Sequence, residues 1–125
     1  MQATRPEQIC QLFQHYMRVG DLESVLTLYD AEAVFLNESG ETKKGEELRQ
    51  ELAPFAEART SFDFTVNEIL RSGDIALIHT QWDIASPQPR SLYAIEVARL
   101  QADGSWRWLI GDPFTIGKHT VEGGR

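Results

Sequence analysis

The second half of the chain alternates between apolar and polar residues, and this period of two restricts the possible fold more than any other feature. Phe62, Phe64 and Val66 alternate with polar residues, and the pattern continues towards the C-terminus. Such alternation is typical of strands that bury one face. The pattern predicts four consecutive antiparallel strands, which begin near residues 62, 75, 91 and 106, and the last strand extends to about residue 115. Turn residues separate them at 72–74, 86–89 and 102–104.

In the first half of the chain the apolar residues recur with the period of a helix. Ile9, Leu12, Phe13, Tyr16 and Met17 are spaced as one apolar stripe of a helix, which Gly20 ends. The pattern then predicts a short helix capped by Asp21, a short strand at 33–37 and a third helix from Glu46 to about Ala58 that contains Pro54.

Helices that are segregated from an antiparallel sheet indicate an α+β fold. At 125 residues the chain forms one domain, which we expect to be ordered from about residue 5 to 117 and disordered over about 118–125. The three helices are expected to cover the concave face of a curved sheet, because their apolar stripes have no other surface to bury against.

Composition excludes several classes of function. The net charge of −7 opposes binding to a nucleic-acid backbone. No apolar run approaches the ~18 residues that a membrane helix needs. The single cysteine, Cys10, fits a reducing compartment, so we expect a soluble, cytoplasmic protein. The three histidines, His15, His79 and His119, have no metal-binding spacing, and we predict neither a metal nor a cofactor.

The order of elements resembles the nuclear-transport-factor-two-like superfamily, which includes SnoaL-like proteins and ketosteroid isomerases. The resemblance rests on Gly20-Asp21-Leu22 at the second helix and Asp103-Gly104-Ser105-Trp106-Arg107 at the last strand. An uncharacterised bacterial branch is the most similar, because of the ending Ile110-Gly111-Asp112-Pro113-Phe114. The resemblance covers roughly residues 5–117. It implies a cystatin-like cone with a pocket between helices and sheet, and a homodimer formed through the outer sheet face.

Ketosteroid isomerases use a tyrosine donor on the first helix, and Tyr16 is similar in placement. Their aspartate base lies near the strand after the second helix. The corresponding run here, Val34-Phe35-Leu36-Asn37, contains no acid, and the first acid is Glu38. The base position is therefore lost or moved, and the resemblance does not imply steroid isomerisation.

Asp112 is the first candidate for catalysis. In a regular strand, Asp112 lies on the same face as Trp106, Trp108 and Ile110. A carboxylate among aromatic residues has a raised pKa and suits a general base. The alternative is that Asp112, which precedes Pro113, accepts backbone hydrogen bonds in a turn.

Tyr16 and His79 are the candidate partners of Asp112. The Tyr16 hydroxyl could donate to a developing oxyanion, or it could have a backbone partner in the core. His79 could carry a proton near neutral pH, or it could be structural or lie at a dimer interface. Because His79 and Trp82 lie on opposite strand faces, they should not both line the pocket.

The remaining candidates would form the wall of the pocket. The substrate-binding residues expected there are Phe35, Asn37, Phe55, Tyr93 and Trp108. Glu96 lies among Leu92, Ala94 and Ala98 on the opposite face from Tyr93. A carboxylate in such a setting is unusual, and we expect it to pair with Arg107 or, alternatively, to serve as the acid.

Two functions remain open. One is a small-molecule pocket protein, which could be a cofactor-free isomerase- or dehydratase-like enzyme that transfers a proton on a small apolar carbonyl or hydroxyl compound. The other is a non-catalytic ligand-sensing or assembly module built on the same fold.

Overall fold

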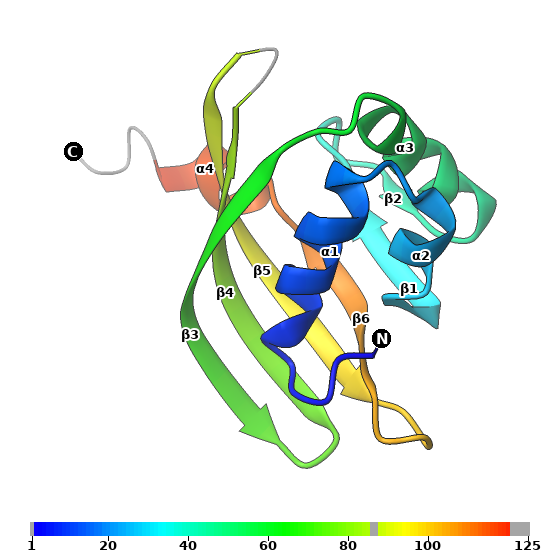
Figure 1. The fold of residues 1–125 in the computed structure, drawn as a ribbon. Coiled ribbons are helices and arrows are strands. Elements are labelled where there is room, and N and C mark those ends of the chain that lie inside the picture. Colours follow the sequence, from blue (N-terminus) through cyan, green and yellow to red (C-terminus); the bar gives the residue numbers. More distant parts are fainter. Residues whose placement is uncertain (1, 86–87, 121–125) are drawn as a thin grey trace.

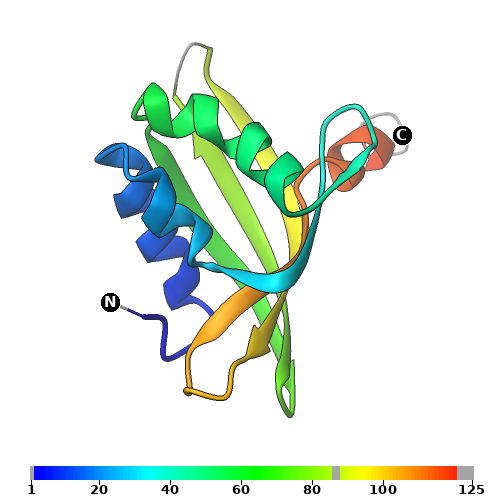
Figure 2. The same ribbon diagram turned by 90° about the vertical axis from the view of Figure 1, so that its right-hand side faces the viewer.

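In the computed structural model the first three helices of the chain lie on one side of a strongly curved sheet, and the C-terminal helix lies on the other side (Figures 1 and 2). The structure describes residues 2–85 and 88–120. The helices are α1 (Gln8–Arg18), α2 (Leu22–Leu26), α3 (Glu46–Glu57) and α4 (Thr115–Thr120). The strands are β1 (Tyr29–Leu36), β2 (Thr42–Lys43), β3 (Phe62–Ser72), β4 (Ile75–Ile84), β5 (Arg90–Leu100) and β6 (Trp106–Asp112). The α+β prediction is confirmed.

The strand order is β2-β1-β6-β5-β4-β3. The pairs from β6 through β3 are antiparallel, as is β1 with β2, whereas β1 and β6 are parallel. The sheet is therefore larger than the four-stranded sheet predicted from the alternating pattern. The parallel pair was missed because it joins strands that lie far apart in the sequence.

The N-terminal helices form where the apolar stripe predicts them. Ile9, Phe13, Tyr16 and Met17 are buried on α1. Gly20 takes the left-handed conformation (φ +75°) that ends a helix readily. The backbone N–H of Ser24 donates to the Asp21 carboxylate at 3.1 Å, which is the predicted cap of α2.

A β-bulge interrupts the alternation of β6. Val97 pairs with Ile110 but Ala98 pairs with Trp108, so Leu109 is the extra residue. Trp106 and Trp108 are buried under the helices, whereas Ile110 is 45% exposed on the outer face. The prediction that these residues and Asp112 share one face is therefore wrong, since the bulge reverses the alternation.

The C-terminal boundary also differs from the prediction. β6 ends at Asp112 instead of about residue 115, and α4 follows. Residues 118–120, which are expected from the sequence to be disordered, belong to this helix. The remainder of that predicted tail, residues 121–125, lies outside the described residues, as do residues 86 and 87 of the predicted proline loop.

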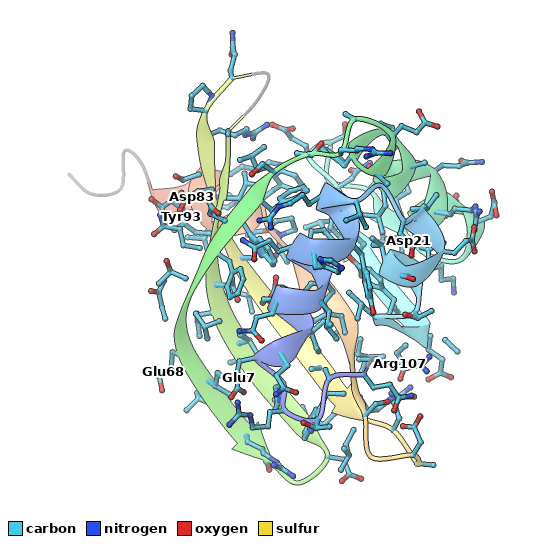
Figure 3. All side chains as sticks on the ribbon, in the orientation of Figure 1. Glu7, Asp21, Glu68, Asp83, Tyr93 and Arg107 are labelled. Atoms are coloured by element: carbon cyan, nitrogen blue, oxygen red, sulfur yellow. The ribbon has the colours of Figure 1, made fainter. Side chains whose placement is uncertain are left out.

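The outer sheet face is open over much of its area. Figure 3 shows Glu68 and Tyr93 on the side of the sheet away from α1. Leu70, Tyr93 and Ile110 are 57%, 45% and 45% exposed. Within the described residues, no helix is both long and apolar enough to cross a membrane.

Candidate functional site

A cavity of about 100 Å³ lies between α1, α3, β1 and the inner sheet face. Eight of its sixteen lining residues are aromatic: Phe13, Tyr29, Phe35, Phe55, Phe62, Trp82, Trp108 and Phe114. Phe55 on α3 is 41% exposed and extends the wall to the molecular surface. The space is smaller than the ~150 Å³ apolar cavity that can hold benzene, so an occupant is compact or moves the wall.

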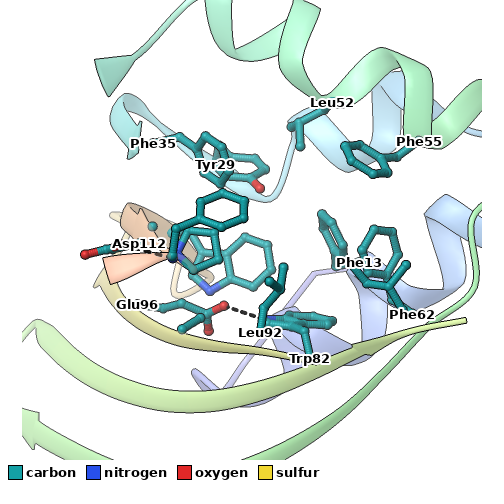
Figure 4. Close-up of a pocket in the computed structure, with 16 residues that line it drawn as sticks. Phe13, Tyr29, Phe35, Leu52, Phe55, Phe62, Trp82, Leu92, Glu96 and Asp112 are labelled. Carbon is teal, nitrogen blue, oxygen red and sulfur yellow. Dashed lines mark hydrogen bonds between the residues drawn. The ribbon is translucent and has the colours of Figure 1, made fainter. Parts of the chain in front are cut away.

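Glu96 is the polar group at the centre of this wall (Figure 4). It lies on β5 between Ala94 and Ala98 and is 6% exposed. The Trp82 indole N–H donates to one carboxyl oxygen at 2.8 Å, and the Thr80 hydroxyl donates to the other at 2.9 Å. Both donors come from β4, because Thr80, Trp82 and Glu96 share the inner face of paired strands.

Burial raises the pKa of the Glu96 carboxyl to about 7. The donors from Trp82 and Thr80, and the nearby Trp108 indole, favour the ionised form but do not offset the loss of water. No lysine, arginine or histidine lines the cavity within the described residues. Glu96 can therefore both bind and release a proton near neutral pH, which is the requirement for a general acid or base.

Two further polar groups of the cavity have no hydrogen-bond partner among residues 2–85 and 88–120. The Tyr29 hydroxyl forms no hydrogen bond with the described residues, and Figure 4 shows it directed into the cavity. Burial and then the nearby Glu96 carboxylate raise its pKa, so the phenol stays protonated and can donate. The buried indole nitrogen of Trp108 also lacks a hydrogen-bond partner in this part of the chain.

Sequence comparison identifies the family of the chain. The sequence model described as a SnoaL-like domain matches residues 10–108, which span most of the fold from α1 to β6. The chain belongs to the SnoaL-like domain family. No curated protein matches it in sequence.

Solved structures share the fold of this SnoaL-like domain at low identity. A candidate calcium/calmodulin-dependent protein kinase type II association domain from Thiobacillus denitrificans has a TM-score of 0.74 at 15% identity, covering 92% of this chain and 99% of that one. An NTF2-like protein of unknown function in nutrient uptake from Rhodospirillum rubrum has a TM-score of 0.69 at 17% identity, covering 86% and 95%.

A third similar structure is a candidate dehydratase of the NTF2-like family from Streptomyces avermitilis. Its TM-score is 0.65 at 18% identity, covering 85% of this chain and 89% of that one. At these identities the similarities establish the fold alone. The names include both an enzyme and an association domain, so the fold of a SnoaL-like domain does not decide between catalysis and assembly.

The three residues predicted for catalysis are not brought together. Tyr16 borders a separate polar groove beside Trp106 and Arg107. His79 lies on the outer sheet face in a groove with Glu68 and Ile116. Neither residue lines the Glu96 cavity. Asp112 and Tyr16 lie on different elements at separate sites.

Asp112 borders the Glu96 cavity, but its carboxylate has another role. It accepts the backbone N–H groups of Phe114 and Thr115 at 3.2 and 3.1 Å. Figure 4 shows the carboxylate directed away from the centre of the cavity. These bonds satisfy donors at the start of α4. The structure therefore has the turn arrangement that was considered as the alternative.

Three of the five residues predicted for the pocket wall line the cavity, namely Phe35, Phe55 and Trp108. Asn37 does not. Its side chain is buried in a turn, where it donates to Glu41 and Glu51 and accepts from the Glu41 backbone. Tyr93 lies on the outer face beside His79 instead.

The position of Glu96 among small apolar residues is unusual in the sequence, but the partner expected for it is not the one in the structure. Arg107 pairs across the strands with Arg99, whereas Glu96 lies opposite Ile78 and Gly111. The predicted Glu96–Arg107 pair is therefore wrong. Tyr29 was not predicted, because nothing in the sequence around it distinguishes it from an ordinary core residue. Its cross-strand position next to Trp108 exists only through the parallel pairing of β1 with β6.

No three histidine, cysteine, aspartate or glutamate side chains in the described ranges are grouped as a metal ion requires. Cys10 lies near Glu96, with its sulfur 4.0 Å from a carboxyl oxygen. Burial, and then the Glu96 charge, raise the pKa of this thiol, so it is not a thiolate near neutral pH.

Proposed function

We propose that the protein binds a small, largely apolar carbonyl or hydroxyl compound in the Glu96 cavity and transfers a proton on it. The observation that carries the proposal is the Glu96 carboxyl, which is buried in an aromatic cavity with a pKa of about 7. In the ionised form Glu96 removes a proton from the carbon beside a carbonyl. The electron pair of the broken C–H bond forms a carbon–carbon double bond, and the π pair of the carbonyl moves onto the oxygen. The Tyr29 hydroxyl donates a hydrogen bond to that oxygen. In a compound with a carbon–carbon double bond next to that carbon, protonated Glu96 returns the proton to the far carbon of the double bond. The electron pair on the oxygen re-forms the carbonyl, and the double bond has moved into conjugation with it, which completes an isomerisation.

Exchange of the α-hydrogens of cyclohexanone in D2O tests this reaction without knowledge of the natural substrate. Proton NMR should show faster exchange with the protein than with an equal concentration of acetate. Glu96→Gln keeps the shape of the side chain but cannot accept the proton, and it should reduce the protein-dependent rate by about 100-fold. Asp112→Asn retains a capping group and should leave the rate within about twofold of wild type.

Exchange that is unchanged in Glu96→Gln would contradict the role of Glu96. Loss of exchange in Asp112→Asn, with an intact thermal transition, would restore Asp112 as the base. A wild-type protein that accelerates nothing, despite binding the ketone, would favour the non-catalytic function.

The second candidate is a non-catalytic assembly module that uses the outer sheet face. It is favoured by the exposed side chains of Leu70, Tyr93 and Ile110 on that face. We further propose that the protein forms a homodimer through this face. Sedimentation equilibrium should give a dimer for the wild type and a monomer for Ile110→Glu. A wild-type protein that stays monomeric at all concentrations would contradict the dimer. The single, buried Cys10 supports a cytoplasmic location.

A further inference from the structure

The charges that line the Glu96 cavity all have one sign. Glu96 and Asp112 are the charged residues among the sixteen that line it, and no basic side chain of the described residues is present to balance them. The hydrogen-bond donors to Glu96 among the described residues are neutral groups of Thr80, Trp82 and Cys10. An ionised Glu96 therefore has donors but no counter-charge. A ligand that carries a negative charge would be repelled, whereas a positive charge would be attracted.

The aromatic side chains around Glu96 add a second attraction for a cation. Trp82 and Trp108 lie with their ring centres 6.2 Å apart, and Phe13 lies 5.2 and 5.3 Å from the two indoles. The ring of Tyr29 also packs against Trp108, with the ring centres 5.3 Å apart. The π faces of such rings attract ammonium groups, most strongly when water is excluded. Apolar walls alone would bind a neutral hydrocarbon equally well, so the buried carboxyl is the distinguishing feature.

We propose that this cavity selects a small organic cation, an amine or a quaternary ammonium compound, over a neutral molecule of the same shape. The inference rests on the proposed ligand-binding function of the cavity and adds the charge of the ligand. It is compatible with a carbonyl or hydroxyl group elsewhere in the same compound, which the Tyr29 hydroxyl would contact. The compact volume of about 100 Å³ favours methyl substituents on the nitrogen over long chains.

The pH dependence of binding follows from the Glu96 carboxyl. A cation binds the ionised form, so affinity should be highest where Glu96 has lost its proton. Because burial raises the pKa of Glu96 to about 7, affinity should fall as pH decreases below that value and stay constant above it. The other charged group at the cavity, Asp112, is held by backbone donors of α4. Cys10 and Tyr29, whose pKa values are both raised, remain neutral over this range.

Choline and 3,3-dimethylbutan-1-ol form a matched pair for the test, because the alcohol replaces the quaternary nitrogen by carbon. Binding is measured at pH 8 through the indole N–H signals of Trp82 and Trp108 in NMR spectra. Choline should bind at least about tenfold more tightly than the alcohol. Glu96→Gln should remove this preference, and lowering the pH from 7 to 5 should weaken choline binding by more than about tenfold. Glu68→Gln makes the same charge change on the outer face and should alter neither result.

Equal binding of the alcohol and choline would overturn the charge selectivity and leave the proposed cavity function in place. A preference for choline that survives in Glu96→Gln or does not change with pH would also overturn the inference. If neither compound shifts the two indole signals at tens of millimolar while cyclohexanone does, the preference for a cation is wrong but the proposed binding function stands. If cyclohexanone also leaves both signals unshifted, the proposed binding function fails as well.

Discussion

Glu96 and Asp30 are two buried carboxyls of one sheet with opposite electrostatic settings. Glu96 is 6% exposed and Asp30 is 7% exposed. Asp30 accepts two hydrogen bonds from the Arg99 guanidinium at 3.0 and 2.7 Å, and a third from Gln101 at 2.8 Å. The Arg99 guanidinium lowers the pKa of Asp30 to about 2, whereas burial among neutral donors raises that of Glu96 to about 7. Burial alone therefore does not determine the charge of a carboxyl, and the presence of a cation does.

This difference separates a structural group from a functional one. The Asp30 carboxylate is fully occupied by Arg99, Gln101 and the backbone of Glu32, and it has no capacity to exchange a proton near neutral pH. The Glu96 carboxyl borders a cavity, and no positively charged side chain of the described residues lines that cavity. Perturbed carboxyls of the second kind cluster at functional sites.

The largest effect is expected from Glu96→Gln on stability. The folded-state pKa of Glu96 is raised from 4.5 to about 7, so the folded protein holds a proton that the unfolded chain releases. The free energy of unfolding should therefore fall as pH rises from about 4.5 to 7, by roughly 3 kcal/mol from this group. Glutamine removes this loss, and urea unfolding at pH 5 and pH 8 measures it. A pH dependence that Glu96→Gln leaves unchanged would mean that Glu96 ionises normally.

A smaller effect of opposite sign is expected at Asp30. Its folded-state pKa is lowered from 3.8 to about 2, so it stabilises the fold above pH 4 and loses that contribution as pH falls towards 2. Asp30→Asn should therefore reduce the free energy of unfolding at pH 7 by about 2 kcal/mol, and the difference from wild type should shrink in acid. Glu32→Gln, at an exposed partner of Arg99, is the control and should cost less than about 1 kcal/mol. An equal loss in both variants would contradict the special role of Asp30.

The smallest effect is expected on the pKa of Glu96 when one of its hydrogen-bond donors is removed. Trp82→Phe keeps an aromatic ring but removes the N–H that favours the ionised carboxyl. The pKa of Glu96 should rise further, by an amount on the order of one unit. Trp106→Phe, on the same inner face but not at the cavity, is the matched control and should leave that pKa unchanged. NMR titration of the carboxyl carbon measures both variants, and a pKa that falls in Trp82→Phe would be inconsistent with the hydrogen bond.

The sequence predicts the fold well because the α1 stripe and the alternation of β3 to β5 are local patterns. It predicts the aromatic wall, since Phe35, Phe55 and Trp108 are large apolar residues that a core must bury. It does not predict the acid, because Glu96 and Asp112 differ only in what surrounds them in three dimensions. The extra residue Leu109 in β6 has no signature in the alternation, and it reverses the face of every residue after it.

The most direct test of the account is the pKa of Glu96 itself. Carbon-detected NMR of glutamate-labelled protein follows each side-chain carboxyl against pH, and Glu96→Gln assigns the signal. We expect one glutamate carboxyl to titrate near pH 7, far above the others, and to be absent from the variant. If every glutamate carboxyl titrates at or below about pH 5, Glu96 is an ordinary ionised group, and its proposed role in proton transfer is wrong.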